Sequence, residues 1–290
     1  MNLKSAALFL SGIILVLPGV ALQAQENEGT LAKIGRTHEF VVGYRTDASP
    51  LSYENAAGEP SGYSVDLCRR IAAAVKAHIG TGDIETRFVG VSSDERIAAV
   101  VSGKIDIECG STTITLSRQE QVDFTIPTFV TGASILSLTR TGIQSMSDLA
   151  GKKVAVVQDT TTVELLENKL QQDLIDAEVV IVGSREEAMN RLNRSDVQAF
   201  ASDQIVLIGQ IIEAANPRGY SLLDETFSYE PYGLVVRRND ADFRLVANRA
   251  ISQIYRSGQH LQIYRKWIGR IGVRPPPMLV AMYQLSTIPE

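Results

Sequence analysis

One stretch of the chain gathers the side-chain types that bind small anions. It spans Glu108–Phe124, ECGSTTITLSRQEQVDF, and starts where a short strand with alternating apolar residues ends. Ser111, Thr112 and Thr113 follow that strand end, and Arg118 opens a short helical turn. Backbone N–H groups at a helix start carry partial positive charge, and a guanidinium matches the two oxygens of a carboxylate. The stretch therefore predicts a site that binds a carboxylate.

A purely structural use of the same residues is the alternative. In that interpretation the Ser/Thr run caps a helix, and Arg118 pairs with Glu120 or Asp123 on the surface. The stretch taken alone does not decide between the two interpretations.

A second candidate site follows the predicted strand Lys153–Val157. Thr160–Thr162 come shortly after it and begin a helix, so they can cap that helix or hold an anion. Asp203 likewise begins a helix just after the predicted strand Val197–Ala201. Its carboxylate suits an N-cap, and it also suits an ammonium group.

The first residues have the pattern of a signal peptide. Lys4 precedes an uncharged apolar run over Ala6–Leu22, and small residues come before the polar segment that begins at Gln25. Cleavage is expected after Ala24 or after Ala21, so residues 1–24 are assigned to the signal peptide and export is expected. No cysteine lies nearby, which excludes a lipoprotein anchor.

Composition excludes several classes of protein. The net charge is −5 and there is no basic cluster, so nucleic acid is not expected as a partner. No stretch after the signal peptide is long and apolar enough to span a membrane. His38, His78 and His260 lie far apart in the sequence, without the spacing of metal ligands, so neither a metal nor a cofactor is expected.

The two cysteines, Cys68 and Cys109, form a disulfide if their Cα atoms come within bonding range in an oxidising compartment. Closing a loop of about 40 residues contributes about 3 to 4 kcal/mol of stability on the chain-entropy model. Two separate buried thiols are the alternative.

Predicted strands alternate with predicted helices, which is typical of an α/β fold with covered sheets. The first unit comprises Glu39–Tyr44, Tyr63–Ala77, Ile84–Val89, Ser93–Val101 and Lys104–Glu108. The second comprises Lys153–Val157, Thr160–Leu170, Glu178–Val182, Arg185–Leu192, Val197–Ala201 and Asp203–Ile212. An apolar run from Leu234 and helices over Asp242–Arg256 and Gln259–Trp267 follow, and Pro275–Pro277 are expected to end regular structure.

This order predicts two lobes, the second inserted into the first. Lobe 1 is expected to comprise residues 35–132 and 229–275, lobe 2 residues 133–228, and a C-terminal tail residues 276–290. Two extended crossings, Thr128–Ala133 and Phe227–Gly233, would join the lobes. Ligands of open α/β sheets bind at the carboxyl ends of the strands, so the cleft between the lobes is the expected binding site.

From about Phe40 to Trp267 the chain resembles the family 3 solute-binding proteins, the periplasmic receptors of ABC importers for polar amino acids. Within the family it is most similar to the glutamate/aspartate-binding members. The segments that carry the resemblance are GYRTDASPLSY, GYSVDLC, SSDERI, IDIECGSTTITLSRQ, QDTTTVELL and AFASD. The resemblance implies a type II two-lobed fold, a periplasmic location, a monomer, a membrane permease as partner, and closure of the lobes over the ligand.

The resemblance also implies roles for individual residues. Arg118 would bind the α-carboxylate of the amino acid with help from Ser111, Thr113 and Thr161, and Asp203 would receive the α-ammonium group. Three further residues would surround the side-chain carboxylate: Arg45, Ser93 and Arg96.

One position departs from the pattern of the glutamate/aspartate-binding members. Where a histidine is expected near the distal carboxylate, this chain has Arg185 at the start of a predicted helix. The extra cation would favour an acidic side chain, but its longer reach changes the available volume. A surface pair with Glu186 or Glu187 is the alternative.

The charges of these residues favour L-glutamate or L-aspartate as the ligand. A neutral amino acid would leave a buried cation unpaired, which typically costs about 3 to 5 kcal/mol. A lysine or histidine ligand would suit a site with an aromatic wall. The chain has Ala48 and Ser49 at that place instead, which disfavours such a ligand. An enzyme is not expected, and a cyclohexadienyl or arogenate dehydratase on the same fold is the alternative function.

Overall fold

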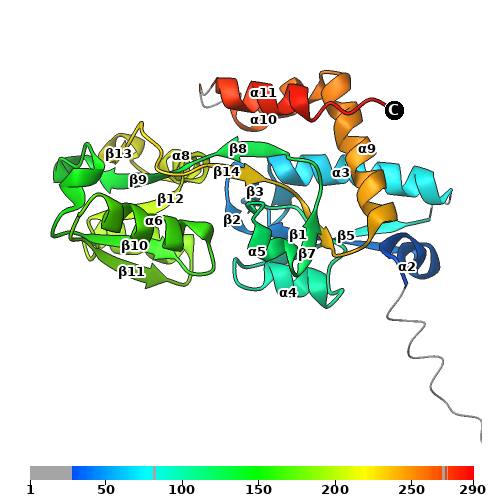
Figure 1. Cartoon of the computed structure of the whole chain (residues 1–290), viewed down its shortest axis with the longest axis horizontal. Coiled ribbons are helices and arrows are strands. Elements are labelled where there is room, and N and C mark those ends of the chain that lie inside the picture. The colour runs from blue at the N-terminus through cyan, green and yellow to red at the C-terminus, as the bar shows by residue number, and fades with distance from the viewer. Residues whose placement is uncertain (1–27, 81–82, 270–271, 273) are drawn as a thin grey trace, which may run out of the picture.

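The computed structural model describes residues 28–80, 83–269, 272 and 274–290. Two α/β lobes lie side by side, with two strands running between them (Figure 1). The expected signal peptide, residues 1–24, lies outside the described residues. Within the described part of the chain, no helix combines the length and apolar character needed to cross a membrane.

The sheet of lobe 1 has the order β5-β1-β6-β15-β7. Strand β1 (Glu39–Arg45) pairs in parallel with β5 (Glu85–Val91) and β6 (Ile107–Glu108). Strand β15 (Val235–Arg237) runs antiparallel to β6 and to β7 (Val122–Phe124), so the sheet is mixed.

Helices cover both faces of this sheet because successive side chains of a strand point to opposite faces. Phe40 and Val42 of β1 belong to one buried cluster, and Val41 belongs to another. The helices of the lobe are α2 (Thr30–Thr37), α3 (Tyr63–Ile79), α4 (Arg96–Val101), α5 (Leu116–Gln119), α9 (Ala241–Arg256) and α10 (Gln259–Trp267). A small sheet of β2 (Asp47–Ala48), β3 (Ser52–Glu54) and β4 (Pro60–Ser61) adjoins β1.

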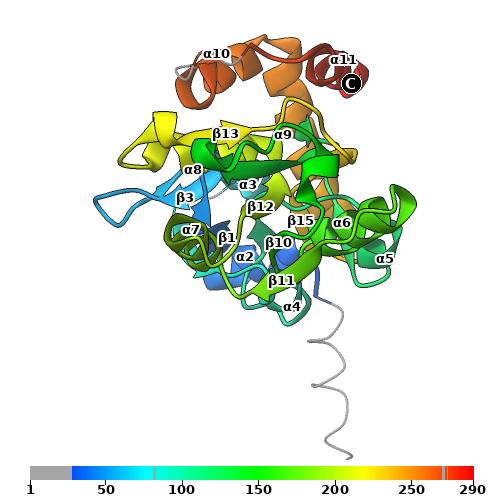
Figure 2. The same cartoon turned by 90° about the vertical axis from the view of Figure 1, so that its left-hand side faces the viewer.

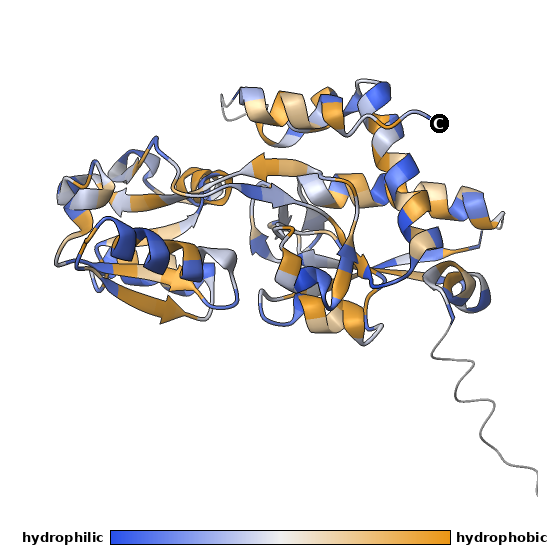
Figure 3. Ribbon diagram, in the orientation of Figure 1, coloured by the Kyte–Doolittle hydropathy of each residue, from blue (hydrophilic) through white to orange (hydrophobic). Residues whose placement is uncertain are grey.

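The sheet of lobe 2 has the order β11-β10-β12-β9-β13, with bounds Glu178–Val182, Lys153–Val157, Ala199–Asp203, Ala133–Leu138 and Tyr220–Leu222. Its first three strands are parallel and β9 is antiparallel to both of its neighbours. Val154 and Val156 face one apolar cluster, whereas Ala155 and Val157 face another. Helices α6 (Thr161–Gln172), α7 (Arg185–Arg194) and α8 (Gln204–Glu213) pack on this sheet. Figure 3 shows that β11 is largely hydrophobic, whereas α6 is mostly hydrophilic.

Two antiparallel strands cross between the lobes. They are β8 (Phe129–Thr131) and β14 (Glu230–Tyr232), and they lie within the two predicted crossings. We propose that the lobes divide at these strands. Thr113 forms a bridge with Tyr232, so the predicted anion-binding stretch is tied directly to the second crossing.

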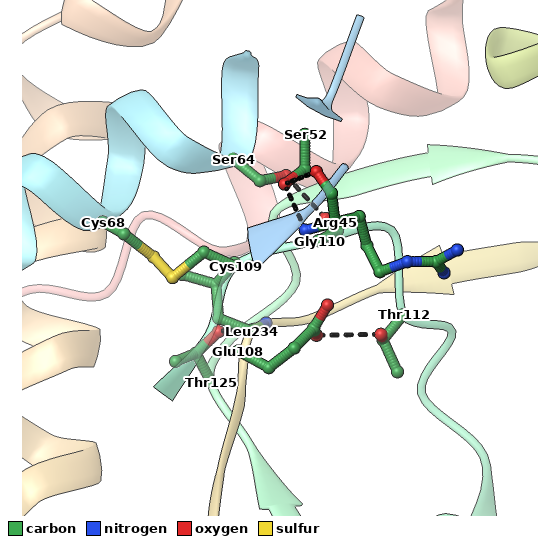
Figure 4. Close-up of a disulfide and its surroundings, with 10 residues drawn as sticks. All are labelled: Arg45, Ser52, Ser64, Cys68, Glu108, Cys109, Gly110, Thr112, Thr125 and Leu234. Atoms are coloured by element: carbon green, nitrogen blue, oxygen red, sulfur yellow. Dashed lines mark hydrogen bonds between the residues drawn. A yellow bond between two sulfur atoms is a disulfide. The ribbon is translucent and has the colours of Figure 1, made fainter. Parts of the chain in front are cut away.

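A disulfide joins Cys68 of α3 to Cys109, the residue directly after β6 (Figure 4). The Cα atoms lie 6.3 Å apart and the cysteines are 41 positions apart in the chain. This confirms the disulfide and excludes the alternative of two separate thiols. The bond fixes the strand end from which the loop Gly110–Thr113 departs.

The expectation that regular structure ends at the prolines is wrong. Helix α11 begins at Pro277 and extends to Leu285. Proline is well tolerated at the first position of a helix, where its missing N–H would have no partner within the helix. Leu279 and Tyr283 are buried in the lobe 1 core, and the hydroxyls of Tyr283 and Tyr63 lie 2.9 Å apart. Figures 1 and 2 show α10 and α11 together on one side of the molecule.

Gly209 allows α8 of lobe 2 to approach lobe 1 closely. A Cβ atom at this position would lie 2.1 Å from the backbone oxygen of Ser49. We expect Gly209→Ala to lower the free energy of unfolding by about 1 to 3 kcal/mol, because helix and loop must separate. Chemical denaturation measures this. Gly35→Ala is the matched control, since its Cβ would meet nothing closer than 3.7 Å; equal stability of the two variants would contradict the prediction.

Candidate functional site

The predicted anion-binding stretch lies at the junction of lobe 1 and the crossing strands. Ser111, Thr112 and Thr113 are buried, and the Ser111 hydroxyl has no hydrogen-bond partner. Nη1 of Arg118 donates to the backbone oxygen of Thr113 at 2.8 Å. This bond holds the guanidinium against the loop and leaves its other N–H groups available for an anion.

The structural alternative for this stretch does not match the contacts. Thr115, rather than the Ser/Thr run before it, caps α5, because its Oγ1 accepts from the backbone N–H of Arg118 at 3.1 Å. Asp123 accepts instead from the backbone N–H of Asn239 at 3.1 Å. No ion pair joins Arg118 to Glu120 or Asp123 among the described residues.

Thr161 brings the second predicted anion site against the first. It is the first residue of α6 in lobe 2, and its Oγ1 lies 3.3 Å from Oγ1 of Thr113 in lobe 1. The same hydroxyl donates to Oε2 of Glu230 in the second crossing at 3.0 Å. Thr160 bonds the backbone oxygen of Val157 and does not cap the helix with its side chain. The two threonine sites therefore meet across the junction of the lobes.

Asp203 is buried at the end of β12 and does not act as a capping side chain for α8. Within the described part of the chain, its Oδ1 meets no donor in hydrogen-bonding geometry, although the Tyr232 hydroxyl lies near enough to act on its pKa. Burial raises the pKa of Asp203, while Tyr232 and the guanidinium groups of Arg185, Arg96 and Arg118 act in the opposite direction. The carboxylate therefore lies within electrostatic reach of guanidinium groups from both lobes.

Arg45, Arg96 and Arg185 form a buried cluster, each no more than 2 % exposed. Among the residues that the structure describes, no hydrogen-bond partner is found for Nε of any of the three or for Nη1 of Arg45. Burial and the neighbouring Arg185 lower the pKa of Arg45 to about 9, and burial and Arg118 lower that of Arg96 to about 10. Both of these guanidinium groups remain protonated at neutral pH. Ser93, shortly before α4, is buried as well.

Residues of lobe 1 and lobe 2 form hydrogen bonds with one another around this cluster. Nη2 of Arg96 donates to the backbone oxygen of Asp159 at 3.3 Å. Oδ1 of Asp47 accepts from Nη2 of Arg45 at 2.7 Å and from Nη1 of Arg185 at 2.9 Å. Arg185 is thus paired with Asp47 and not with the neighbouring acidic residues of its own helix, which excludes the surface-pair alternative.

Three buried or half-buried carboxylates of this region were not predicted from the sequence: Asp47, Glu108 and Glu230. Oε2 of Glu108 accepts from Thr112 Oγ1 at 2.8 Å, and its Oε1 has no partner (Figure 4). Burial raises the pKa of Glu108 and of Glu230, and for Glu230 the nearby Asp203 raises it further. An acidic residue at the end of the predicted strand Lys104–Glu108, next to the Ser/Thr run, is the signal that could have identified Glu108.

Two cavities are lined by residues of this region. One, of about 570 Å³, is lined by Asp47 and Arg185 together with residues of α7 and α8. The other, of about 400 Å³, is lined by Thr113, Arg118 and Thr161 among others. Together the geometry defines a class of protein: a two-lobed binding protein whose charged groups face one another across the junction of the lobes.

The comparisons agree with this class and name the family. Residues 40–270 match the bacterial extracellular solute-binding proteins, family 3, and the chain belongs to this family. The L-glutamate/L-aspartate-binding protein of Pseudomonas aeruginosa is 34% identical over 262 residues, which cover 90% of this chain and 87% of the relative. The protein is therefore a substrate-binding component of an amino-acid ABC importer.

Solved structures of the same fold include one with glutathione bound and an ancestral arginine-binding protein bound to arginine. A periplasmic binding protein from Brucella ovis with glutathione bound is 27% identical, with a TM-score of 0.74, and the match covers 81% of this chain and 73% of that one. The ancestral amino acid-binding protein AncCDT-1, a precursor of cyclohexadienyl dehydratase, is also 27% identical, with a TM-score of 0.70 and coverage of 82% and 99%. The type II two-lobed fold is thus confirmed.

Proposed function

We propose that the protein captures L-glutamate or L-aspartate in the periplasm and delivers it to the membrane permease of an ABC importer. The observation that carries the proposal is the buried cluster of Arg45, Arg96 and Arg185, whose spare N–H groups suit a side-chain carboxylate. The likeness to the glutamate/aspartate-binding protein of Pseudomonas aeruginosa supports the same ligand class.

The two ends of the amino acid would use different groups. Arg118 would bind the α-carboxylate, with hydroxyls from Ser111, Thr113 and Thr161 as additional donors. Asp203 would receive the α-ammonium group, since no donor among the described residues bonds its Oδ1 in hydrogen-bonding geometry. Ser93 would assist the arginine cluster at the distal carboxylate.

The charge balance of the site supports an acidic ligand. Four guanidinium groups, those of Arg45, Arg96, Arg118 and Arg185, face four carboxyl groups, those of Asp47, Glu108, Asp203 and Glu230. Burial raises the pKa of Glu108 and of Glu230, which reduces the negative charge that would repel a second carboxylate, while an ionised Asp203 would pair with the ammonium group. The ligand would bind groups of both lobes at once and so shift the protein toward its closed form.

Isothermal titration calorimetry with the mature protein tests the proposal. We expect L-glutamate and L-aspartate to bind with a dissociation constant of about 1 μM or below, and L-glutamine and L-leucine to bind far more weakly. A thermal-shift screen across the twenty amino acids would identify any other ligand. Absence of heat and of competition at millimolar acidic ligand would refute the proposal.

The binding of an ammonium group by Asp203 predicts a pH dependence. Burial raises the pKa of this carboxyl, so it gains a proton as pH falls through that raised value, and the neutral form has no charge to pair with the ligand. Affinity is therefore expected to fall as the pH is lowered from neutrality, starting at a higher pH than for an ordinary aspartate, and binding in that range should release protons.

Calorimetry in two buffers of different ionisation enthalpy measures these protons. Asp173→Asn is the matched control, because this aspartate pairs with Lys169 on the surface of α6 and its loss should leave the profile unchanged. Affinity that stays constant across the range would contradict an ionised Asp203 as the ammonium partner.

A dehydratase is the alternative function. The likeness to AncCDT-1 and the buried carboxyls with raised pKa values, Glu108 among them, favour it, since a protonated carboxyl is a general acid. Incubation with prephenate or arogenate, followed by detection of phenylpyruvate or phenylalanine, distinguishes the two functions. Turnover would replace the binding role with an enzymatic one.

A further inference from the structure

Asp47 provides a carboxylate inside the region proposed for the ligand's side chain. It follows Arg45 by two positions, at the start of the short strand β2, and its side chain is 25% exposed. A single oxygen, Oδ1, accepts from Arg45 at 2.7 Å and from Arg185 at 2.9 Å. The protein thus carries a carboxylate of its own between two guanidinium groups.

The two arginines belong to different lobes. Arg45 ends β1 of lobe 1, and Arg185 begins α7 of lobe 2. Both guanidinium groups are almost completely buried, and charged pairs of this kind are far less screened than pairs on the surface. Burial opposes ionisation of Asp47, but the two guanidinium groups outweigh it and hold its pKa below the usual value. The bridge is therefore a charged contact that exists only when the lobes are together.

Asp47 takes only part of the donors that the arginines offer. Nε and Nη1 of Arg45 and Nε of Arg185 have no hydrogen-bond partner in the described ranges of the chain. A second carboxylate that used these donors would lie near Asp47, so the two negative groups would repel each other. The cavity of about 570 Å³ lined by Asp47 and Arg185 gives the aspartate space to move away.

We infer that Asp47 is an internal carboxylate that holds the lobes together without ligand and competes with the ligand's side-chain carboxylate for Arg45 and Arg185. The second half of this inference rests on the proposed function. The competition makes Asp47 a specificity-determining residue. Its carboxylate repels the side-chain carboxylate of an acidic ligand, but it does not repel the neutral side chain of an amide ligand.

Small-angle scattering of the ligand-free protein tests the bridge between the lobes. Asp47→Asn keeps the size of the side chain and removes its charge, so we expect a larger radius of gyration than for the wild type. Glu186→Gln is the matched control, because Glu186 is an exposed residue lining the same cavity, and it should leave the radius unchanged. A radius for Asp47→Asn equal to that of the wild type overturns the bridge.

Calorimetry with glutamate and glutamine, and with aspartate and asparagine, tests the competition. We expect Asp47→Asn to raise the preference for each acid over its amide by about tenfold, because the repulsion has been removed. If Asp47 acted only in folding or in closure of the lobes, Asp47→Asn would change the affinities for an acid and for its amide by the same factor. An unchanged preference for the acid therefore overturns the proposed competition between Asp47 and the ligand. If the wild type binds neither acid, the proposed function and the competition fail, while the scattering result still decides the bridge.

Discussion

Replacement of Arg118 by alanine is expected to weaken the binding of every amino acid by at least about 100-fold. The reason is that the α-carboxylate is common to all of them and would lose its main cation in a buried site, a change that typically costs about 3 to 5 kcal/mol. Hydrogen bonds from Ser111, Thr113 and Thr161 would remain, but these hydroxyls carry no charge. Calorimetry with each acidic and amide ligand measures the loss.

Two further variants distinguish the loss of the carboxylate-binding guanidinium from a general loss of folded protein. Arg118→Lys keeps the positive charge but lacks the planar fork, so it should recover only part of the affinity. Arg87→Ala removes an arginine that pairs with Glu39 on the surface and should bind as the wild type does. An Arg118→Ala protein with wild-type affinity would show that another group holds the α-carboxylate.

The double substitution Cys68→Ser and Cys109→Ser is expected to lower the free energy of unfolding by about 3 to 4 kcal/mol. The bond closes a loop of 41 positions, and its removal restores that conformational freedom to the unfolded chain. The linked strand end carries Glu108 and the loop to Thr113, so loss of the bond would also loosen the site. Urea denaturation at equilibrium measures the change in stability.

Addition of ligand checks that the wild type and the double serine variant both start from a folded protein that binds it. Saturating amino acid binds only the folded form, so it should raise the midpoint of denaturation in both proteins. Equal unfolding free energies of wild type and double serine variant would contradict a stabilising role for the bond.

The sequence was sufficient to predict the elements that depend on local residue patterns and the disulfide, which depends on covalent chemistry. Strands such as Lys153–Val157 carry apolar runs, and helix α3 repeats apolar residues at helical spacing before Gly80, so these elements lie close to their predicted positions. The disulfide partners were also predictable, since the chain has only two cysteines. Helix α11 was missed because a proline run was interpreted as a stop, although Pro277 can begin a helix.

The structure brings together the predicted site residues, but contacts between distant segments were not predictable. Asp47 looks like an ordinary turn residue in the sequence, and only the folded chain brings Arg185 to it from 138 positions away. The partner of Arg185 therefore could not be inferred from its neighbours Glu186 and Glu187. Glu230 was missed for the same reason, because its contact with Thr161 spans 69 positions.

A crystal structure of the mature protein grown with L-glutamate tests the central claim most directly. The account predicts one amino acid between the lobes, with its α-carboxylate on the guanidinium of Arg118 and its ammonium group on Asp203. Its side-chain carboxylate should contact Arg45, Arg96 or Arg185. A complex in which Arg118 points into bulk solvent and the ligand lies elsewhere would contradict the account.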